Sequence, residues 1–401
     1  MRMNLGVAIL ALALAGTTPA IAATCGNTAE GFDGFLSAVK RDAAKQGVNG
    51  VALAQLEGVQ YDPAIIKRDR AQNVFAQSFL QFSGRMATDY RIKHGRELIA
   101  KHQQTFDAVQ QQYGVPAAVI TAFWALETDF GADIGKAPTI QALVTLGWDC
   151  RRPEKFRPQI IPALMLIQNG DLQPEEMRGA WAGEIGQTQF MAYDYNESAV
   201  DFDQDGKRNL RDSIPDVLAS TANLLKKYGW QPGQPWLQEV AVPADLPWDK
   251  ADLAIQLPRS QWVKWGVTAI GGKALKADKV PAALLLPMGK DGPAFLAYSN
   301  FTKSYLKWNE SLVYSTTVAY LATRIAGAAK VSPGRAAVQP LSYAEIVVIQ
   351  NKLAGMGYDV GKPDGKIGAG TRAAVKAEQL KMGLPADSYP NAAFLAKLTG
   401  G

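Results

Sequence analysis

The sequence predicts a mainly α-helical protein (α+β) with a small β region and a separate helical module at its C-terminal end. Helical periodicity dominates residues 31–236, a β-rich stretch follows up to residue 301, and a segment of linker composition precedes residue 341. A chain of 401 residues has room for two or three domains, and 47% hydrophobic with 20% charged residues is typical of globular proteins. Extensive disorder is therefore excluded.

The N-terminus has the pattern of an export signal. Arg2 precedes the apolar run 5–14, and the tripeptide AIA that follows matches a signal-peptidase site. The apolar run is shorter than the roughly 20 residues that span a bilayer, so a membrane anchor is disfavoured. We expect residues 1–22 to be a signal peptide and the mature chain to have no transmembrane segment. A lipid on Cys25 is the weaker alternative, because AAT before it lacks the usual leucine.

Cys25 and Cys150 are the two cysteines of the chain. In an oxidising compartment an even pair is more often bridged than free, so we expect one disulfide. It would fix the start of the mature chain to the middle of the main domain. Two separate buried thiols are the alternative.

Apolar residues at intervals of three and four indicate helices along most of the main domain, and alternating or β-rich stretches indicate strands after Trp236. The sequence GKDG from Gly289 is typical of a hairpin turn. Helices are expected at 32–46, 98–113, 116–128, 217–228 and 311–326, and strands at 239–243, 282–286 and 294–301. The expected domains are the main domain 23–330, the linker 331–340 and the terminal module 341–401.

Charge and histidine content exclude several classes of function. The 42 basic and 37 acidic residues give a net charge of +5 without long runs of like charge, so we expect no nucleic-acid partner. His94 and His102 are the two histidines, which is too few for a multi-histidine zinc site or a distributed Ser/His/Asp triad. Catalysis is therefore expected to depend on carboxylates.

Glu127 is the carboxylate that stands out. It interrupts the apolar sequence PAAVITAFWALETDFG, which has Pro116 at the first helical position and Gly131 just past the end. Burial and the negative end of the helix dipole both raise the pKa of an acid at this place, which suits a general acid. A glutamate paired with a cation at a solvated helix edge is the alternative.

A second motif is the glycine-rich run GAWAGEIGQTQFM at 179–191. Its glycines allow close backbone approach, and Trp181, Gln187 and Gln189 offer the aromatic and amide groups that bind sugar rings. A tightly packed glycine turn before a core helix is an equally good interpretation.

A third motif begins at Asp201 and has the form D-x-D-x-D-G with Asn209 at position nine. Oxygen ligands at this spacing are typical of a Ca²⁺ loop. An Asp/Gly turn without metal is the alternative. The candidate ligands are Asp201, Asp203, Asp205 and Asp212 at position twelve, or Asp216 instead of Asp212 in a slightly longer loop.

Together, ALETDFG, the W-A-G-x-x-G-x-x-Q-F-M run and the calcium-like loop resemble the membrane-bound lytic transglycosylase B family (glycoside hydrolase family 103 type) over about 32–326. The resemblance implies a goose-lysozyme-like core with flanking helices and a small β insertion. It also implies cleavage of the MurNAc–GlcNAc β-1,4 bond of peptidoglycan with formation of 1,6-anhydro-MurNAc. In this family pattern Glu127 matches the catalytic glutamate, and the substrate-binding positions match Gln189, Phe190, Met191, Trp308, Asn309 and Tyr314.

The resemblance also indicates surroundings and partners. No cofactor is expected for the chemistry. Asp201, Asp203, Asp205 and the Lys207 carbonyl match the calcium loop of the family, and calcium is expected to stiffen this loop. Glycan strands in the periplasm of a Gram-negative bacterium are the expected partner, together with the machinery of wall synthesis or lysis. The segment from Ile349 to Val375 resembles a three-helix peptidoglycan-binding domain.

Departures from the family pattern keep two other functions open. Ala180 replaces a usual serine and Leu224 a usual cleft tyrosine, which motivates a catalytically idle wall-binding protein. A hydrolytic muramidase would need a second carboxylate, for which Asp129 and Glu184 are the candidates. Asp129 is only two residues from Glu127 and points off another helix face, while Glu184 stands where the family commonly has a small residue.

Overall fold

The computed structural model describes residues 25–71 and 77–400. The expected signal peptide 1–22 lies outside this part of the chain. Within it, no helix combines the length and apolar character that a membrane crossing requires.

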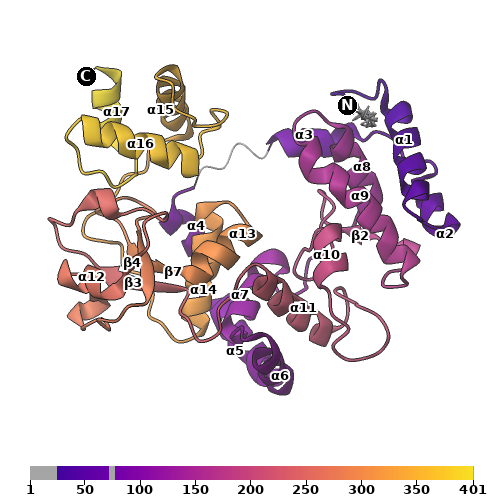
Figure 1. Cartoon of the computed structure of the whole chain (residues 1–401), viewed down its shortest axis with the longest axis horizontal. Coiled ribbons are helices and arrows are strands. Elements are labelled where there is room, and N and C mark those ends of the chain that lie inside the picture. Colours follow the sequence, from indigo (N-terminus) through magenta and orange to yellow (C-terminus); the bar gives the residue numbers. More distant parts are fainter. Residues whose placement is uncertain (1–24, 72–76, 401) are drawn as a thin grey trace, which may run out of the picture.

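The chain up to residue 227 is helical, as the sequence predicts. Its helices lie in two groups in Figure 1, one around α1, α8 and α9 and the other around α5, α6 and α7. The two-residue strands β1 (Ala137–Pro138) and β2 (Arg178–Gly179) pair antiparallel with each other. The helices are α1 (Phe32–Lys45), α2 (Gly50–Leu53), α3 (Pro63–Ala71), α4 (Phe79–Met86), α5 (Asp89–Lys101), α6 (Gln103–Tyr113), α7 (Ala117–Thr128), α8 (Thr139–Trp148), α9 (Pro153–Gln168), α10 (Ala192–Ser198) and α11 (Ile214–Lys227).

An antiparallel sheet follows, with strand order β4-β6-β7-β3-β5. The central strands correspond to the three predicted ones, whereas the two-residue edge strands are too short to leave a pattern. The hairpin between β6 and β7 turns at Gly289, whose φ of 77° favours glycine. The elements are β3 (Leu237–Ala241), β4 (Leu257–Pro258), α12 (Arg259–Lys264), β5 (Thr268–Ala269), β6 (Pro281–Leu285) and β7 (Ala294–Tyr298).

The chain then returns to the helical part. A π-helical turn at Phe301–Tyr305 leads into α13 (Leu306–Trp308), and α14 (Leu312–Ile325) begins at its N-cap Ser311, as predicted. Helix α14 packs against α7, α4 and α5. This return brings residues 308–314 beside the helix that carries Glu127.

Helix α7 is enclosed on nearly all sides, because α5, α6, α11 and α14 pack around it. Residues 118–126 are all buried, which explains why the sequence shows no polar face there. A helix that is apolar all round is stable only inside a protein core.

Two details differ from the sequence predictions. The helix expected at 98–113 is interrupted at His102 (φ −109°, ψ 27°), which ends α5 and begins α6. Both halves keep a buried face, with Ile92 in α5 and Phe106 in α6, so periodicity alone does not reveal the break. Pro116 is the N-cap of α7 rather than its first residue, since its ψ of 145° is extended.

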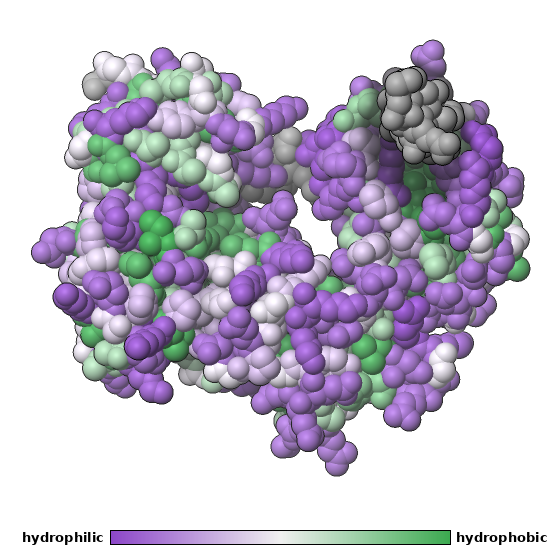
Figure 2. Space-filling view, in the orientation of Figure 1, coloured by the Kyte–Doolittle hydropathy of each residue, from purple (hydrophilic) through white to green (hydrophobic). Residues whose placement is uncertain are grey.

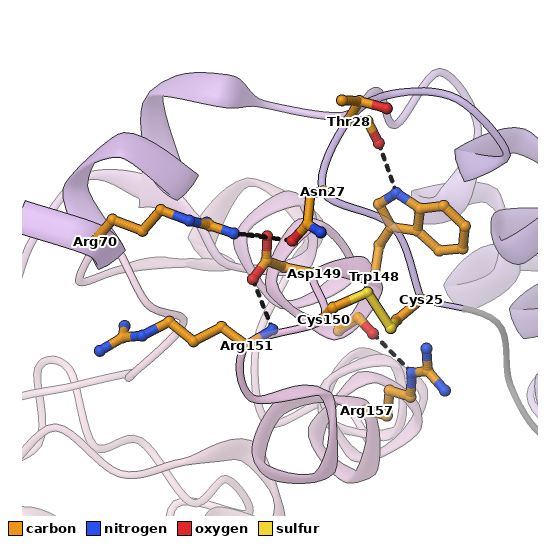
Figure 3. The surroundings of a disulfide bond; sticks show 10 residues. Cys25, Asn27, Thr28, Arg70, Trp148, Asp149, Cys150, Arg151 and Arg157 are labelled. Atoms are coloured by element: carbon orange, nitrogen blue, oxygen red, sulfur yellow. Dashed lines mark hydrogen bonds and ion pairs between the residues drawn. A yellow bond between two sulfur atoms is a disulfide. The ribbon is translucent and has the colours of Figure 1, made fainter. Parts of the chain in front are cut away.

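The predicted disulfide between Cys25 and Cys150 is present (Figure 3). The amide of Gly26 donates to the Trp148 carbonyl at 3.0 Å, and the Trp148 indole donates back to the Thr28 carbonyl at 2.7 Å. The N-terminal segment is therefore held against the end of α8 by hydrogen bonds as well as by the covalent bond.

The C-terminal module consists of α15 (Tyr343–Gly355), α16 (Ala369–Lys381) and α17 (Ala392–Thr399). Ile349, Leu353 and Phe394 form its core. Glu378, where the resemblance suggested a weaker core, is 3% exposed and accepts hydrogen bonds from Tyr358 and Lys381. A buried carboxylate is thus compensated by two donors.

The module packs on the β region (Figure 1). Arg372 of α16 donates to the Leu286 carbonyl at 2.8 Å, and Lys376 pairs with Asp252 at 2.7 Å. The segment expected to be a linker is also attached, because the Arg335 amide donates to the Asp291 carbonyl at 2.7 Å. Figure 2 shows that the surface is open between the half with this module and the half with α1, α8 and α9.

Candidate active site

Glu127 lies at the penultimate position of α7, where the helix ends abruptly. The helix ends at Thr128, and the three residues that follow it, Asp129, Phe130 and Gly131, all have positive φ. The predicted glycine stop is therefore preceded by two non-glycine residues in the same strained region. Asp129 is held there by Arg91, whose Nε donates to Oδ1 at 2.9 Å. Glu127, near this helix end, is only partly buried, unlike residues 118–126.

Two donors from the C-terminal end of the main domain meet at one oxygen of Glu127. The Trp308 indole donates to Oε1 at 2.8 Å, and the Tyr314 hydroxyl donates to the same atom. Trp308 comes from α13 and Tyr314 from the first turn of α14. Both residues were expected from the resemblance as substrate-binding groups, but their direct contact with the carboxyl was not.

The electrostatic surroundings favour the protonated form of Glu127. Burial is the largest cause and raises the pKa of its carboxyl from 4.5 to about 7, with the negative charge of Glu184 acting in the same direction. The hydrogen bonds from Tyr314 and Trp308 act in the opposite direction and lower that pKa. The Tyr314 hydroxyl itself has its pKa raised well above 10 by burial, so it stays a donor.

Aromatic rings surround the carboxyl. The Trp308 ring lies 4.3 Å from that of Phe123 in α7 and 5.7 Å from that of Phe190. These contacts hold the indole in the orientation in which it donates to Glu127. The rings exclude water from one side of the acid, which is the physical origin of its raised pKa.

The glycine-rich motif forms a tight hairpin. Ile185 and Phe190 exchange backbone hydrogen bonds at 2.8 and 2.9 Å around a turn in which Gln189 has a φ of 54°. The side-chain Nε2 of Gln189 donates a hydrogen bond to the Gly186 carbonyl at 2.8 Å and so stabilises the turn. The hairpin presents Phe190 to Trp308.

Gln187 has a structural role, which favours the interpretation of the motif as a tightly packed glycine turn. Its Oε1 accepts from the Trp124 indole at 2.8 Å, and its Nε2 donates to the Arg211 carbonyl at 2.7 Å. A Cβ at Gly131 would lie 2.3 Å from the same Oε1 atom. Gln187 thus fastens the hairpin to the end of α7.

The other predicted binding residues, all within the described part of the chain, form no hydrogen bond with the Glu127 carboxyl and differ in burial. Met191 is the N-cap of α10 and is partly buried against the core. Asn309 follows Trp308 directly and uses its side-chain oxygen to accept the Ser311 amide at 2.9 Å. Leu224, the departure from the expected tyrosine, is 3% exposed and belongs to the core, so it offers nothing to a cleft.

The predicted calcium loop brings three carboxylates together. Asp201, Asp203 and Asp205 each have an oxygen within 4.8 Å of the others, the one such group among the described residues. The amides of Asp205 and Gly206 donate to Asp201 at 3.1 and 2.9 Å, and Gly206 has the positive φ (91°) that the turn requires. Converging carboxylates are the donors that Ca²⁺ prefers, so these residues fit the ion.

The remaining predicted ligands lie outside this group. The Asp216 carboxylate accepts hydrogen bonds from the backbone amides of Phe202 at 2.7 Å and Asn209 at 2.8 Å. It therefore joins the two ends of the loop. Asp212 is exposed on the far end of the loop. The Lys207 amide donates to Asp205 at 2.9 Å, which places its peptide next to the carboxylates.

Glu184, which stands just before the hairpin, was not predicted to have a role in transglycosylation. The sequence suggested it only as a second acid for hydrolysis. Its charge raises the pKa of Glu127, and burial raises the pKa of Glu184 itself. The signal available in the sequence was the single carboxylate inside the glycine-rich run at 179–191.

Comparison with known proteins supports this description. Residues 31–323 match the family described as "Transglycosylase SLT domain", and residues 342–398 match "Putative peptidoglycan binding domain". SltB3 from Pseudomonas aeruginosa, crystallised in complex with NAG-anhNAM-pentapeptide, superposes with a TM-score of 0.85 at 37% identity, covering 93% of this chain and 100% of that one. The fold, mainly helical with a small sheet and lysozyme-like, is therefore shared.

Two further relatives are more distant. Membrane-bound lytic murein transglycosylase B of Escherichia coli (strain K12) is 28% identical over 232 residues, which are 58% of this chain and 59% of the relative's length. The structure of E. coli Slt35 in complex with calcium has a TM-score of 0.62 at 24% identity, covers 73% of this chain and 92% of that one, and shows a common fold. Since the first family match spans most of the chain, this protein belongs to the transglycosylase SLT domain family.

Proposed function

We propose that the protein is an exported lytic transglycosylase. It would cleave the MurNAc–GlcNAc β-1,4 bond of peptidoglycan and form 1,6-anhydro-MurNAc, with Glu127 as the single catalytic acid and base. The observation that carries this proposal is a glutamate whose pKa is raised to about 7 at the centre of an aromatic site. An acid in this range is protonated often enough near neutral pH to donate, and its anion is basic enough to accept.

In the first step, the protonated Glu127 gives its proton to the glycosidic oxygen as the bond to MurNAc C1 breaks. An oxocarbenium-like centre develops at C1, and the GlcNAc side leaves as an alcohol. The donors Trp308 and Tyr314 hold the Glu127 anion that results, because both lie on its Oε1.

In the second step, the Glu127 anion takes the proton of the C6 hydroxyl of the same MurNAc while O6 bonds to C1. The nucleophile is part of the substrate, so it has a high effective concentration and needs no second carboxylate to activate water. The proton gained from the C6 hydroxyl restores Glu127 for the next cycle.

The ion pair that Asp129 forms supports transglycosylation over hydrolysis. A muramidase that inverts needs a second carboxylate as base, and Asp129 is instead paired with Arg91. The ligand bound in the crystal structure of the relative SltB3 carries an anhydro sugar, which is the kind of product that this reaction forms. Glu184 is the remaining candidate for a hydrolytic base, so a muramidase stays the second function to test.

The rest of the proposal concerns substrate and surroundings. Gln189, Phe190, Met191, Trp308, Asn309 and Tyr314 would line the glycan site. Asp201, Asp203, Asp205 and the Lys207 carbonyl would hold calcium, which would stiffen the loop behind the hairpin and take no part in the chemistry. The module at 342–398 would hold glycan strands in the periplasm, and wall synthesis or lysis proteins are the proposed protein partners.

Mass spectrometry of the products released from purified sacculi tests the reaction. Anhydro ends are expected; reducing ends would mean that water attacks, and binding without products would favour an idle wall-binding protein. Glu127→Gln is expected to lower release by about 10²-fold or more while sacculus binding is retained. Glu175→Gln, the same change at an exposed site, is the matched control.

A further inference from the structure

A buried serine joins the two segments that carry the donors to Glu127. Trp308 is the last residue of α13 and Tyr314 lies in the first turn of α14, and both donate to Oε1 of Glu127. Ser315 follows Tyr314 directly and is 1% exposed. Its hydroxyl is within hydrogen-bond distance of the backbone of the segment that carries Trp308.

The Ser315 hydroxyl faces two backbone carbonyls. Its Oγ lies 2.6 Å from the carbonyl oxygen of Asn309 and 3.0 Å from that of Tyr305. These carbonyls flank Trp308, since Asn309 is the next residue and Tyr305 comes three residues earlier. A hydroxyl has one proton, which it gives to one acceptor or shares between both. In either case the backbone around the indole is attached to the first turn of α14.

The backbone around Trp308 is irregular. Helix α13 has three residues, follows a π-helical turn, and ends at Asn309 with extended angles (φ −146°, ψ 121°). A helix this short is not stable by itself, so its position depends on contacts with other segments. The Asn309 amide donates to the Tyr305 carbonyl at 3.1 Å, and the Asn309 side chain accepts the Ser311 amide at 2.9 Å. The Ser315 hydroxyl adds the contact from inside α14.

The next two residues of α14 differ from Ser315. Thr316 and Thr317 are fully buried, and neither hydroxyl forms a hydrogen bond with the described residues. A buried hydroxyl without a partner costs free energy, whereas the hydroxyl of Ser315 has two acceptors. Removal of the Thr316 hydroxyl is therefore a matched control, because it changes the same turn of the helix without breaking the contact with α13.

We infer that Ser315 is a positioning residue that holds the Trp308 indole in place to donate to Glu127. This inference rests on the proposed function, in which the indole stabilises the Glu127 anion. Ser315 touches no reacting atom, because it acts through the backbone of α13. The rings of Phe123 and Phe190 confine the indole, and the hydroxyl fixes the backbone from which the indole extends.

NMR of the tryptophan side chains in the full chain tests the inference without turnover. The indole N–H signal of Trp308 is the one missing in Trp308→Phe, a change that keeps a ring and removes the donor. In Ser315→Ala we expect this signal to move upfield, because its hydrogen bond to Glu127 is weaker. Thr316→Val should leave the signal in place, and Ser315→Thr, which retains a hydroxyl, should restore it.

The pH dependence of muropeptide release from sacculi measures the consequence for the reaction. The rate falls on the alkaline limb of the profile as Glu127 loses its proton. Burial and the charge of Glu184 raise the pKa of Glu127, and the bonds from Tyr314 and Trp308 lower it. For Ser315→Ala we therefore expect the alkaline limb to move to higher pH and the maximal rate to fall about fivefold.

A double variant checks that Ser315 acts through the indole. In the Trp308→Phe background, Ser315→Ala is expected to cause no further shift of the alkaline limb, because the donor is already absent. Thr316→Val alone is expected to keep the wild-type limb and rate.

Other results would overturn the inference. An unchanged indole signal in Ser315→Ala would show that the aromatic rings alone hold Trp308. A loss of rate that is equal at every pH, or the same effects in Thr316→Val, would show a general effect on stability. An indole signal that moves in Ser315→Ala while wild-type protein makes no anhydro products would support the inference and count against the proposed function alone.

Discussion

The indole nitrogen of Trp308 lies 2.8 Å from Oε1 of Glu127, although the two residues are 181 positions apart in the chain. The β region between α11 and α13 separates the two residues in sequence, and the packing of α14 on α7 brings the two residues together. The acid and its donors therefore belong to different parts of the chain, and the site exists only when both have folded.

Removal of the Tyr314 hydroxyl is expected to move the alkaline limb of activity to higher pH. Its hydrogen bond stabilises the Glu127 anion and lowers the pKa of that carboxyl, so Tyr314→Phe raises the pKa further above about 7. The maximal rate should fall as well, because the anion formed in the first step loses a donor.

The pH profile of sacculus solubilisation measures both effects. Tyr343→Phe, at an exposed tyrosine of the terminal module, is the control. A shift to lower pH in Tyr314→Phe would contradict the role assigned to this hydrogen bond.

Glu127→Gln is expected to stabilise the protein at high pH more than at low pH. The pKa of Glu127 is about 7 in the folded chain against an ordinary value of 4.5, so the folded state binds more protons between these values and stability falls as pH rises through this window. The wild type loses up to about 3 kcal/mol across it by the linkage relation, and the glutamine variant does not.

Thermal unfolding of both proteins, at one pH below this window and one above it, measures the difference. The melting temperature of the variant should exceed that of wild type above the window and approach it below. A constant difference at every pH would mean that the carboxyl is not titrating in this range.

Calcium is expected to raise the melting temperature through the loop at Asp201. An ion that binds only the folded protein stabilises it by about 2.7 kcal/mol at a hundredfold excess over its Kd. Asp205→Asn should abolish the rise because Asp205 is one of three converging carboxylates.

Thermal unfolding with calcium, with magnesium and with a chelator tests this expectation. Asp245→Asn, an exposed aspartate in the β region, serves as the control. Equal melting temperatures in calcium and chelator would mean that the loop is held by its own hydrogen bonds, such as those of Asp216 to the Phe202 and Asn209 amides.

Arg372→Ala is expected to release the terminal module from the β region. The Arg372 guanidinium is buried at this contact and donates to the Leu286 carbonyl, so its loss leaves an unpaired acceptor and a cavity. Limited proteolysis should then cut within 327–341 several times faster, with a matching increase in the radius of gyration.

Lys397→Ala, on α17, is the control for the change of charge. An unchanged cleavage rate in Arg372→Ala would show that the contacts of Lys376 with Asp252 and of Arg335 with Asp291 suffice to hold the module.

Local patterns were sufficient for most elements. They singled out Glu127 as the proposed acid because a single carboxylate in an apolar helix is costly, and this cost is visible in the sequence. They indicated the loop at Asp201 because its carboxylates are close together in the chain. The edge strands β4 and β5 were missed, since a short element leaves too few residues to show a period, and the break at His102 was missed because both helices keep a buried face.

The sequence by itself determined the helical class, the small sheet and the disulfide pair, because each depends on residues near one another or on composition, and it singled out Glu127 as the proposed acid. Tertiary structure alone decided the partners of those residues. It buried Gln187 against Trp124, used Asp216 to close its loop, and brought Trp308 and Tyr314 to the carboxyl of Glu127. Burial and electrostatic neighbours come from segments distant in the chain, and these set the pKa on which the chemistry depends.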